Sequence, residues 1–173
     1  SSLCTTGSLV TDGLLRALGR SCPRLRHLSI FNSVPRVSRM RTYLIPPGDA
    51  TPPGRGVSLS PTDAGILAVT ASCPLLESLQ IGGNSDNTLP KVTNACLADI
   101  ARRCPRLACV SFEHTYNVND AALAELARLP RLSSLSLLHT RVTSAGAIAA
   151  IKTMPALSLV HIFSSVVSVA PDA

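Results

Sequence analysis

The sequence is poor in aromatic residues, and this scarcity limits the ligands that the protein can bind. Among 173 residues there are three Phe, two Tyr and no Trp. Proteins that bind single-stranded nucleic acid stack its bases on aromatic side chains, so the sequence argues against a stacking platform. Apolar runs of membrane-spanning length are also missing, because Ser and His interrupt the longest ones. No basic segment followed by an apolar core opens the chain, so no secretory signal is expected.

Motifs for catalysis and metal binding are absent as well. The chain has no glycine-rich phosphate loop, and the sequence GGN at Gly82 predicts only a turn. Its six cysteines form no CxxC pair and no Cys/His cluster with zinc spacing. His114 and His139 occupy the same position in two successive units beside Glu113, but two histidines without a third ligand do not predict a metal site. We therefore expect a protein that is not an enzyme and has no cofactor, metal or small-molecule substrate.

A repeated phrase dominates what is present. Its pattern is P-x-L-x-x-[L/V]-x-[L/I/F], and consecutive prolines lie 51, 31, 25 and 25 residues apart. The five copies are PRLRHLSI from Pro23, PLLESLQI from Pro74, PRLACVSF from Pro105, PRLSSLSL from Pro130 and PALSLVHI from Pro155. A period of this length is typical of stacked repeats.

Each copy follows a segment with the pattern of a helix. A Thr or Asn side chain stands just before an apolar run, as at a helix N-cap; the pairs are Thr11-Asp12, Thr62-Asp63, Thr93-Asn94, Asn119-Asp120 and Thr143-Ser144. Apolar residues three apart then mark one helix face; they are Leu15/Leu18, Ile66/Val69, Leu97/Ile100, Leu123/Leu126 and Ala147/Ala150. The proline ends the helix, and the alternating apolar residues after it predict a short strand.

A small polar residue follows each predicted strand, three positions after its last apolar residue. These residues are Ser33, Asn84, Thr115, Thr140 and Ser165. Stacked units would bring them into a polar ladder that satisfies backbone groups inside the turns.

These units resemble the leucine-rich repeat (LRR) family, and in particular the cysteine-containing subtype of F-box/LRR (RNI-like) proteins. The resemblance rests on the "TDxGL…CPxLxxLxL" phrase and covers most of the chain. It implies an α/β fold, a right-handed horseshoe solenoid of about five repeats with a parallel sheet on its concave face and helices on its convex face. One domain is expected over residues 1–173, with repeats at about 11–33, 62–84, 93–115, 119–140 and 143–165. Cys22, Cys73 and Cys104 share the position where this family buries a reduced thiol, which favours a reducing compartment such as cytosol, nucleus, mitochondrial matrix or axoneme.

The residues that alternate with the strand leucines predict the concave face. They are His27, Ser29 and Phe31; Ser78, Gln80 and Gly82; Cys109, Ser111 and Glu113; Ser134, Ser136 and Leu138; and Leu159, His161 and Phe163. The face is rich in serine and almost uncharged. We expect its large or polar members to contact a partner, with the rim phenylalanines as anchors; these candidates are His27, Phe31, Glu113, His161 and Phe163.

The first third of the chain has few acidic residues. Residues 1–55 contain eight Arg against Asp12 and Asp49, whereas residues 56–173 are balanced. The long first interval contains an insertion rich in Pro and Arg at residues 34–60. Long loops in compact domains are functional or disordered, so two interpretations are open: a solvated insertion, or a contact site for a protein or RNA partner. The contact candidates are Arg36, Arg39, Arg41, Tyr43 and Arg55.

The chain begins within a unit, because Leu3 aligns with strand leucine Leu135. Neither end shows the polar cap that terminal repeats need, so we expect either a longer protein or ends covered by partners.

Together these patterns predict a non-catalytic module that binds other proteins, as a structural or scaffolding subunit of a large intracellular assembly. One alternative, implied by the resemblance, is the substrate-recognition region of an F-box-type ubiquitin ligase. Another is an RNA-contacting subunit of a ribonucleoprotein, acting through the basic insertion.

Overall fold

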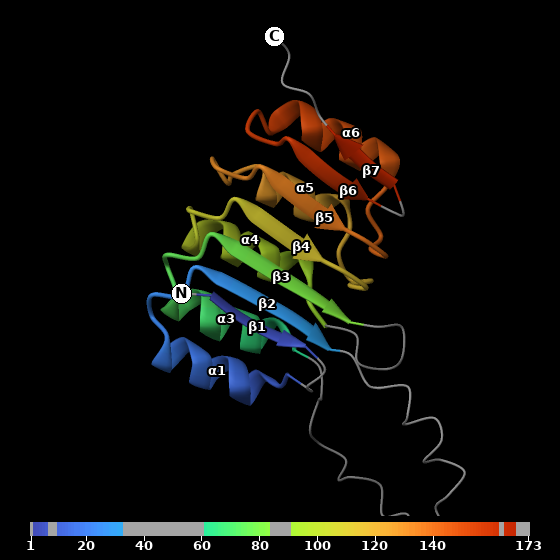
Figure 1. The fold of residues 1–173 in the computed structure, drawn as a ribbon. Coiled ribbons are helices and arrows are strands. Elements are labelled where there is room, and N and C mark those ends of the chain that lie inside the picture. The colour runs from blue at the N-terminus through green and yellow to red at the C-terminus, as the bar shows by residue number, and fades with distance from the viewer. Residues whose placement is uncertain (1, 7–9, 33–60, 84–90, 163–164, 169–173) are drawn as a thin grey trace, which may run out of the picture.

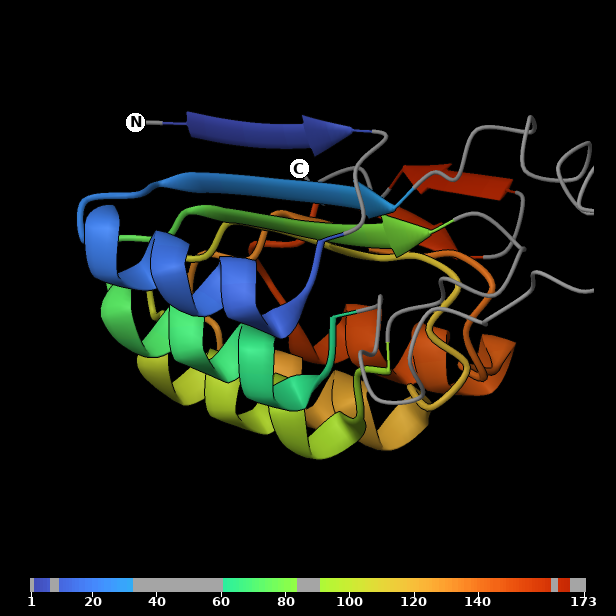
Figure 2. The ribbon, with the colours of Figure 1, turned by 90° about the horizontal axis from the view of Figure 1, so that it is seen from below.

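A computed structural model gives the fold and describes residues 2–6, 10–32, 61–83, 91–162 and 165–168. The protein is an α/β structure in which helices and strands alternate along the chain (Figure 1). The strands form one sheet, and the described helices all pack on the same face of it (Figure 2). The other face is covered by no described helix.

The strands are adjacent in the sheet in the order in which they occur in the chain. They are β1 (Ser2–Thr6), β2 (His27–Asn32), β3 (Ser78–Gly83), β4 (Cys109–Phe112), β5 (Ser134–Leu137), β6 (Leu159–Ile162) and β7 (Ser165–Ser168). Pairing is parallel from β1 through β6, as predicted. Only β7 runs antiparallel, against β6, and Ser165 begins this strand.

Each helix begins at a predicted capping residue. The helices are α1 (Asp12–Ser21), α3 (Asp63–Ser72), α4 (Asn94–Arg103), α5 (Asp120–Leu126) and α6 (Ser144–Thr153). Their N-caps are Thr11, Thr62, Thr93, Asn119 and Thr143, the first member of each predicted pair. Four of these side chains accept a hydrogen bond from the first turn of their own helix, whereas Thr93 does not.

The predicted apolar positions form the core, in register from unit to unit. Leu28, Leu79, Val110, Leu135 and Val160 are directly paired across the sheet and almost fully buried. The predicted helix residues pack against them, and only Leu18 is partly exposed. Burial of such side chains stabilises the fold by roughly 1.5–3 kcal/mol each.

The first strand lies in register with the repeated strands. Leu3 pairs with Leu28 in the parallel ladder between β1 and β2.

A second set of contacts joins the helix starts of neighbouring units. The carboxylate of Asp12 accepts hydrogen bonds from the backbone N–H (2.8 Å) and hydroxyl (2.6 Å) of Thr62. Asp63 bonds Thr93 in the same way at 2.9 and 2.6 Å, and Asp120 bonds Thr143 at 2.7 and 2.6 Å. We call these contacts, with the Asn94–Asn119 pair between them, the cap ladder.

The repeated cysteines lie where the helices end. Cys22, Cys73 and Cys104 are the C-cap residues of α1, α3 and α4, and none is in a disulfide. The thiol of Cys73 donates to the carbonyl of Cys22 at 3.2 Å, and the thiol of Cys104 lies 3.9 Å from the carbonyl of Cys73. Burial raises the pKa of the Cys104 thiol to about 11. The expected buried, reduced thiols are therefore present at Cys73 and Cys104, and Cys22 is half-buried.

In the described part of the chain, no helix combines the length and apolar character needed to cross a membrane.

Candidate protein-binding face

The uncovered face of the sheet matches the face expected from the alternation of the strands. We call it the strand face; its described side chains are His27, Ser29, Ser78, Gln80, Gly82, Cys109, Ser111, Glu113, Ser134, Ser136, Leu138, Leu159 and His161. The alternate residues of the same strands are buried beneath it. Because successive side chains of a strand point to opposite faces, one strand pattern determines both surfaces.

Polar side chains form a continuous row across the middle of this face. Ser29, Gln80, Ser111, Ser136 and His161 are aligned in the register of β2 to β6. The hydroxyl of Ser29 donates to Oε1 of Gln80 at 3.2 Å, and the Gln80 amide lies 3.8 Å from the Cys109 sulfur. The serines of this row are short and permit close approach by the backbone of a partner.

Charge is confined to the two ends of the strands. At the start of β2, His27 lies 3.9 Å from Glu77, which also pairs with Arg26 at 3.3 Å. After the end of β4, Glu113 accepts a 3.4 Å hydrogen bond from Ser111. Its backbone N–H donates to the carbonyl of Ile81. The strand face therefore offers polar contacts but no strong electrostatic attraction.

A histidine pair lies beside Glu113. The rings of His114 and His139 are stacked, with centroids 4.2 Å apart and planes 14° from parallel. Both residues have left-handed backbone conformations, with φ of 57° and 52°, a region that few residues other than glycine adopt. Burial, and then the nearby His139, lower the pKa of His114. The expected side-by-side arrangement is confirmed, and within the described residues no group of three potential ligands gathers around a metal position.

Two members of the expected polar ladder have described side chains. Thr115 is fully buried, and its hydroxyl has no hydrogen-bond partner in the described part of the structure. The hydroxyl of Thr140 instead donates to the carbonyl of Leu137 at 3.1 Å and accepts from the N–H of Val142 at 3.4 Å. Both of these contacts lie within a single turn.

Other predicted residues lie outside the described residues. These are the polar-ladder residues Ser33 and Asn84, the rim residue Phe163, and the insertion residues Arg36, Arg39, Arg41, Tyr43 and Arg55. Phe31 belongs to β2, but only its backbone is described. The proposed contacts of these side chains stay predictions.

A hollow of about 410 Å³ lies between α5 and α6, on the helix side of the sheet. Its lining is mainly apolar, and Asp120 is its one titratable residue. Hydrogen bonds to Thr143 occupy that carboxylate and lower its pKa, so the hollow offers no free acid or base for chemistry.

Two features escaped sequence reasoning: the contacts of the cap ladder between units, and the gathering of basic residues at one edge of the sheet. The signal for the first was an acidic residue repeated after the N-cap, at Asp12, Asp63 and Asp120. The signal for the second was arginine repeated after the turn proline, at Arg24, Arg106 and Arg131.

Comparison with known proteins adds no relative: no protein-family model matches the chain, and no curated protein matches it.

Proposed function

We propose that this chain is a non-catalytic leucine-rich repeat module that binds another protein across its strand face, as a scaffolding subunit of a larger assembly. The observation that carries the proposal is the register of β2 to β6, which lines up uncharged polar side chains and a histidine across five of the seven strands of the sheet. The face extends over adjacent strands of one sheet (Figure 1), which suits a macromolecular surface better than a small molecule. Stacked helix–strand units with one layer of helices are the arrangement that the resemblance implies.

The shape of the surface supports a protein partner. Standard protein interfaces involve about 20–30 residues on each side, and the strand face presents residues of several adjacent strands in one surface. Ser134 and Ser136 on this face are half-buried and have short side chains, which lose little side-chain entropy on binding. The larger Gln80, Leu138 and Leu159 can supply anchoring contacts.

The test is a pull-down with quantitative mass spectrometry from extract of the native cells, with a matched pair of variants. Ser136→Arg places a long charged side chain in the middle of the strand face. Ala17→Arg adds the same charge on the exposed surface of α1. The proposal requires at least tenfold loss of specific partners with Ser136→Arg and their retention with Ala17→Arg, with both variants folded by circular dichroism. Retention of every partner by folded Ser136→Arg would reject the strand face as the binding site.

A second candidate is the substrate-recognition region of an F-box-type ubiquitin ligase. Buried thiols at Cys73 and Cys104 favour it, since they occupy the repeat position that holds cysteine in the F-box/LRR proteins that the chain resembles. Cullin and its adaptor among the wild-type partners would support this candidate, whereas a stable set of assembly subunits would support the scaffold.

A further inference from the structure

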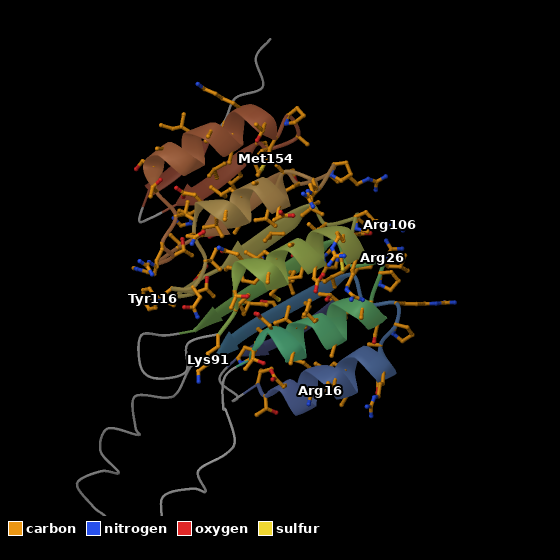
Figure 3. The ribbon with its side chains drawn as sticks, turned by 180° about the vertical axis from the view of Figure 1, so that it is seen from behind. Arg16, Arg26, Lys91, Arg106, Tyr116 and Met154 are labelled. Atoms are coloured by element: carbon orange, nitrogen blue, oxygen red, sulfur yellow. The ribbon has the colours of Figure 1, made fainter. Side chains whose placement is uncertain are left out.

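Basic residues gather at the edge of the sheet where helices end and strands begin. Nine exposed cations lie there, and we call this surface the basic edge: Arg20, Arg24, Arg26, Arg102, Arg103, Arg106, Arg128, Arg131 and Lys152. In Figure 3, Arg26 and Arg106 lie at one side of the molecule, whereas Lys91 and Tyr116 lie at the other. Basic residues therefore gather at this edge in later units as well, although residues 56–173 carry no net charge.

Described acidic residues pair with three of these cations. Glu77 pairs with Arg26, Asp99 with Arg102, and Glu125 with Arg128. The cap-ladder acids Asp12, Asp63 and Asp120 lie at the opposite ends of the helices. Within the described residues, Arg103, Arg106 and Arg131 form no ion pair. Charges of one sign on one edge raise the local potential and attract an anionic partner.

The helix dipole explains only part of the pattern. Arg20, Arg102, Arg103 and Lys152 lie in the last turns of their helices, where a cation is stabilising. Arg24, Arg106 and Arg131 lie beyond the helices, directly after the turn proline of three units. These arginines are not in the last turn of a helix, so the helix dipole does not explain why arginine recurs at this position.

The basic edge also has an apolar component held on a fixed backbone. The five turn prolines are all exposed there: Pro23, Pro74, Pro105, Pro130 and Pro155. The carbonyls of Arg26, Glu77, Ala108 and Ser133 each accept two N–H groups of the next unit, at 2.7–3.1 Å. These bonds fix the spacing of the turns, so that the exposed proline rings, three of which are followed by an arginine, are held in place without a partner.

We propose that the basic edge docks an acidic segment of another protein, in which carboxylates alternate with apolar side chains. Eight of its nine cations are arginine, whose planar guanidinium binds carboxylates with two hydrogen bonds. The apolar residues of the segment would pack on the prolines. RNA is the disfavoured ligand, because none of the described residues at the basic edge is an aromatic on which a base could stack. This contact goes beyond the proposed function, because it uses a different surface from the strand face.

The test measures the binding of a fluorescein-labelled peptide of repeated Glu-Leu-Glu triplets by fluorescence anisotropy. The double variant Arg106→Ser/Arg131→Ser removes two cations that form no ion pair within the described residues. The control Lys91→Ser/Arg141→Ser removes the same charge from exposed residues at the other edge, where each lies two residues before an N-cap. We expect the first pair to weaken binding about tenfold and the control to weaken it less than about twofold.

Two further probes separate the ligand classes. An all-Glu peptide of equal length should bind more weakly than the Glu-Leu-Glu peptide, and a uridine RNA of equal charge should also bind more weakly. The proposal is overturned if the wild-type protein does not bind the Glu-Leu-Glu peptide, if the control weakens binding as much as the edge variant, or if either probe binds more tightly. Ser136→Arg should leave the binding of the Glu-Leu-Glu peptide unchanged. A failure of the strand-face proposal would therefore show in the pull-down, whereas a failure of the basic-edge proposal would show in the peptide binding.

Discussion

The carboxylate of Asp63 accepts hydrogen bonds from both donors of Thr93, the N-cap residue of the next helix. One oxygen accepts the backbone N–H of Thr93 at 2.9 Å, and the other accepts its hydroxyl at 2.6 Å. Thr93 makes no capping bond within its own helix. The first residue of α3 therefore positions the start of α4, and the cap ladder connects each helix with its neighbour.

Removal of this carboxylate should destabilise the protein. We expect Asp63→Ala to lower the free energy of unfolding by about 2 kcal/mol, because it leaves two polar groups of Thr93 without their charged acceptor. Asp63→Asn should cost less, since an amide oxygen still accepts one bond. The matched control is Asp99→Ala, which removes an acid that pairs on the surface with Arg102 and should cost less than about 0.5 kcal/mol. Urea unfolding measures all three, and equal midpoints for Asp63→Ala and Asp99→Ala would refute the role of the ladder.

The ladder also requires a small residue at the third helical position. A Cβ on Gly146 would collide with the Asp120 carboxylate, whereas a Cβ on Gly13 would meet nothing closer than the Thr11 hydroxyl at 3.7 Å. Alanine is the better helix former by about 1 kcal/mol. Gly13→Ala should therefore raise the free energy of unfolding by about 0.5–1 kcal/mol, and Gly146→Ala should lower it by at least about 1 kcal/mol. The same substitution of glycine by alanine should therefore raise the thermal unfolding midpoint at Gly13 and lower it at Gly146. An increase for both variants would contradict the packing described.

Much of the fold could be predicted because its signals are local. Thr62 and Thr93 stand before apolar runs, and Pro74 and Pro105 follow the C-cap cysteines. The sequence therefore predicts where these helices start and end. The antiparallel β7 was not predicted, since its sequence SVVS lacks the pattern of the repeated unit. The cap ladder also escaped prediction, because it depends on how closely two helices stack.

The candidate surfaces were predictable to different degrees. Alternation along each strand assigns residues such as Ser111 and Ser136 to the strand face, because the neighbouring apolar residues point to the opposite, buried face of the sheet. The basic edge is formed by residues of separate units, such as Arg106 and Arg131. Their common location is visible only when the units are aligned by repeat position. The insertion supplied half of the predicted contact residues, but it lies outside the described residues.

The burial of thiols predicts which cysteines react. Cys22 and Cys109 are half-buried, whereas Cys73, Cys96 and Cys104 are buried. Burial raises the pKa of Cys73, Cys96 and Cys104, so few thiolates, the reactive form, exist there at neutral pH. In the folded protein, iodoacetamide at about pH 8 should modify Cys22 and Cys109 at least tenfold faster than Cys73, Cys96 and Cys104. Peptide mass spectrometry measures the rate at each site. The difference should disappear in urea, and equal rates without urea would contradict the buried positions.

Folding stability should fall as the pH is lowered below about 6.5, because of the histidine pair. The pKa of His114 in the folded protein lies below the 6.5 of an unperturbed histidine, first because burial disfavours the cation and second because His139 is nearby. As the pH falls, the unfolded chain therefore takes up this proton before the folded protein does. The stability contribution is present above about pH 6.5 and is lost as the pH falls through the unfolded pKa.

Two variants isolate that contribution. His114→Asn keeps a residue that tolerates the observed φ of 57° but cannot be protonated, so its free energy of unfolding should change less between about pH 7.5 and 5.5 than that of the wild type. His139→Asn removes the neighbouring ring and leaves the burial of His114, so its pH dependence should lie between those of the wild type and His114→Asn. Urea unfolding across this pH range measures the slopes. An unchanged slope in His114→Asn would mean that the stacked pair contributes nothing to the acid sensitivity, since this variant removes the group whose proton uptake differs between the two states.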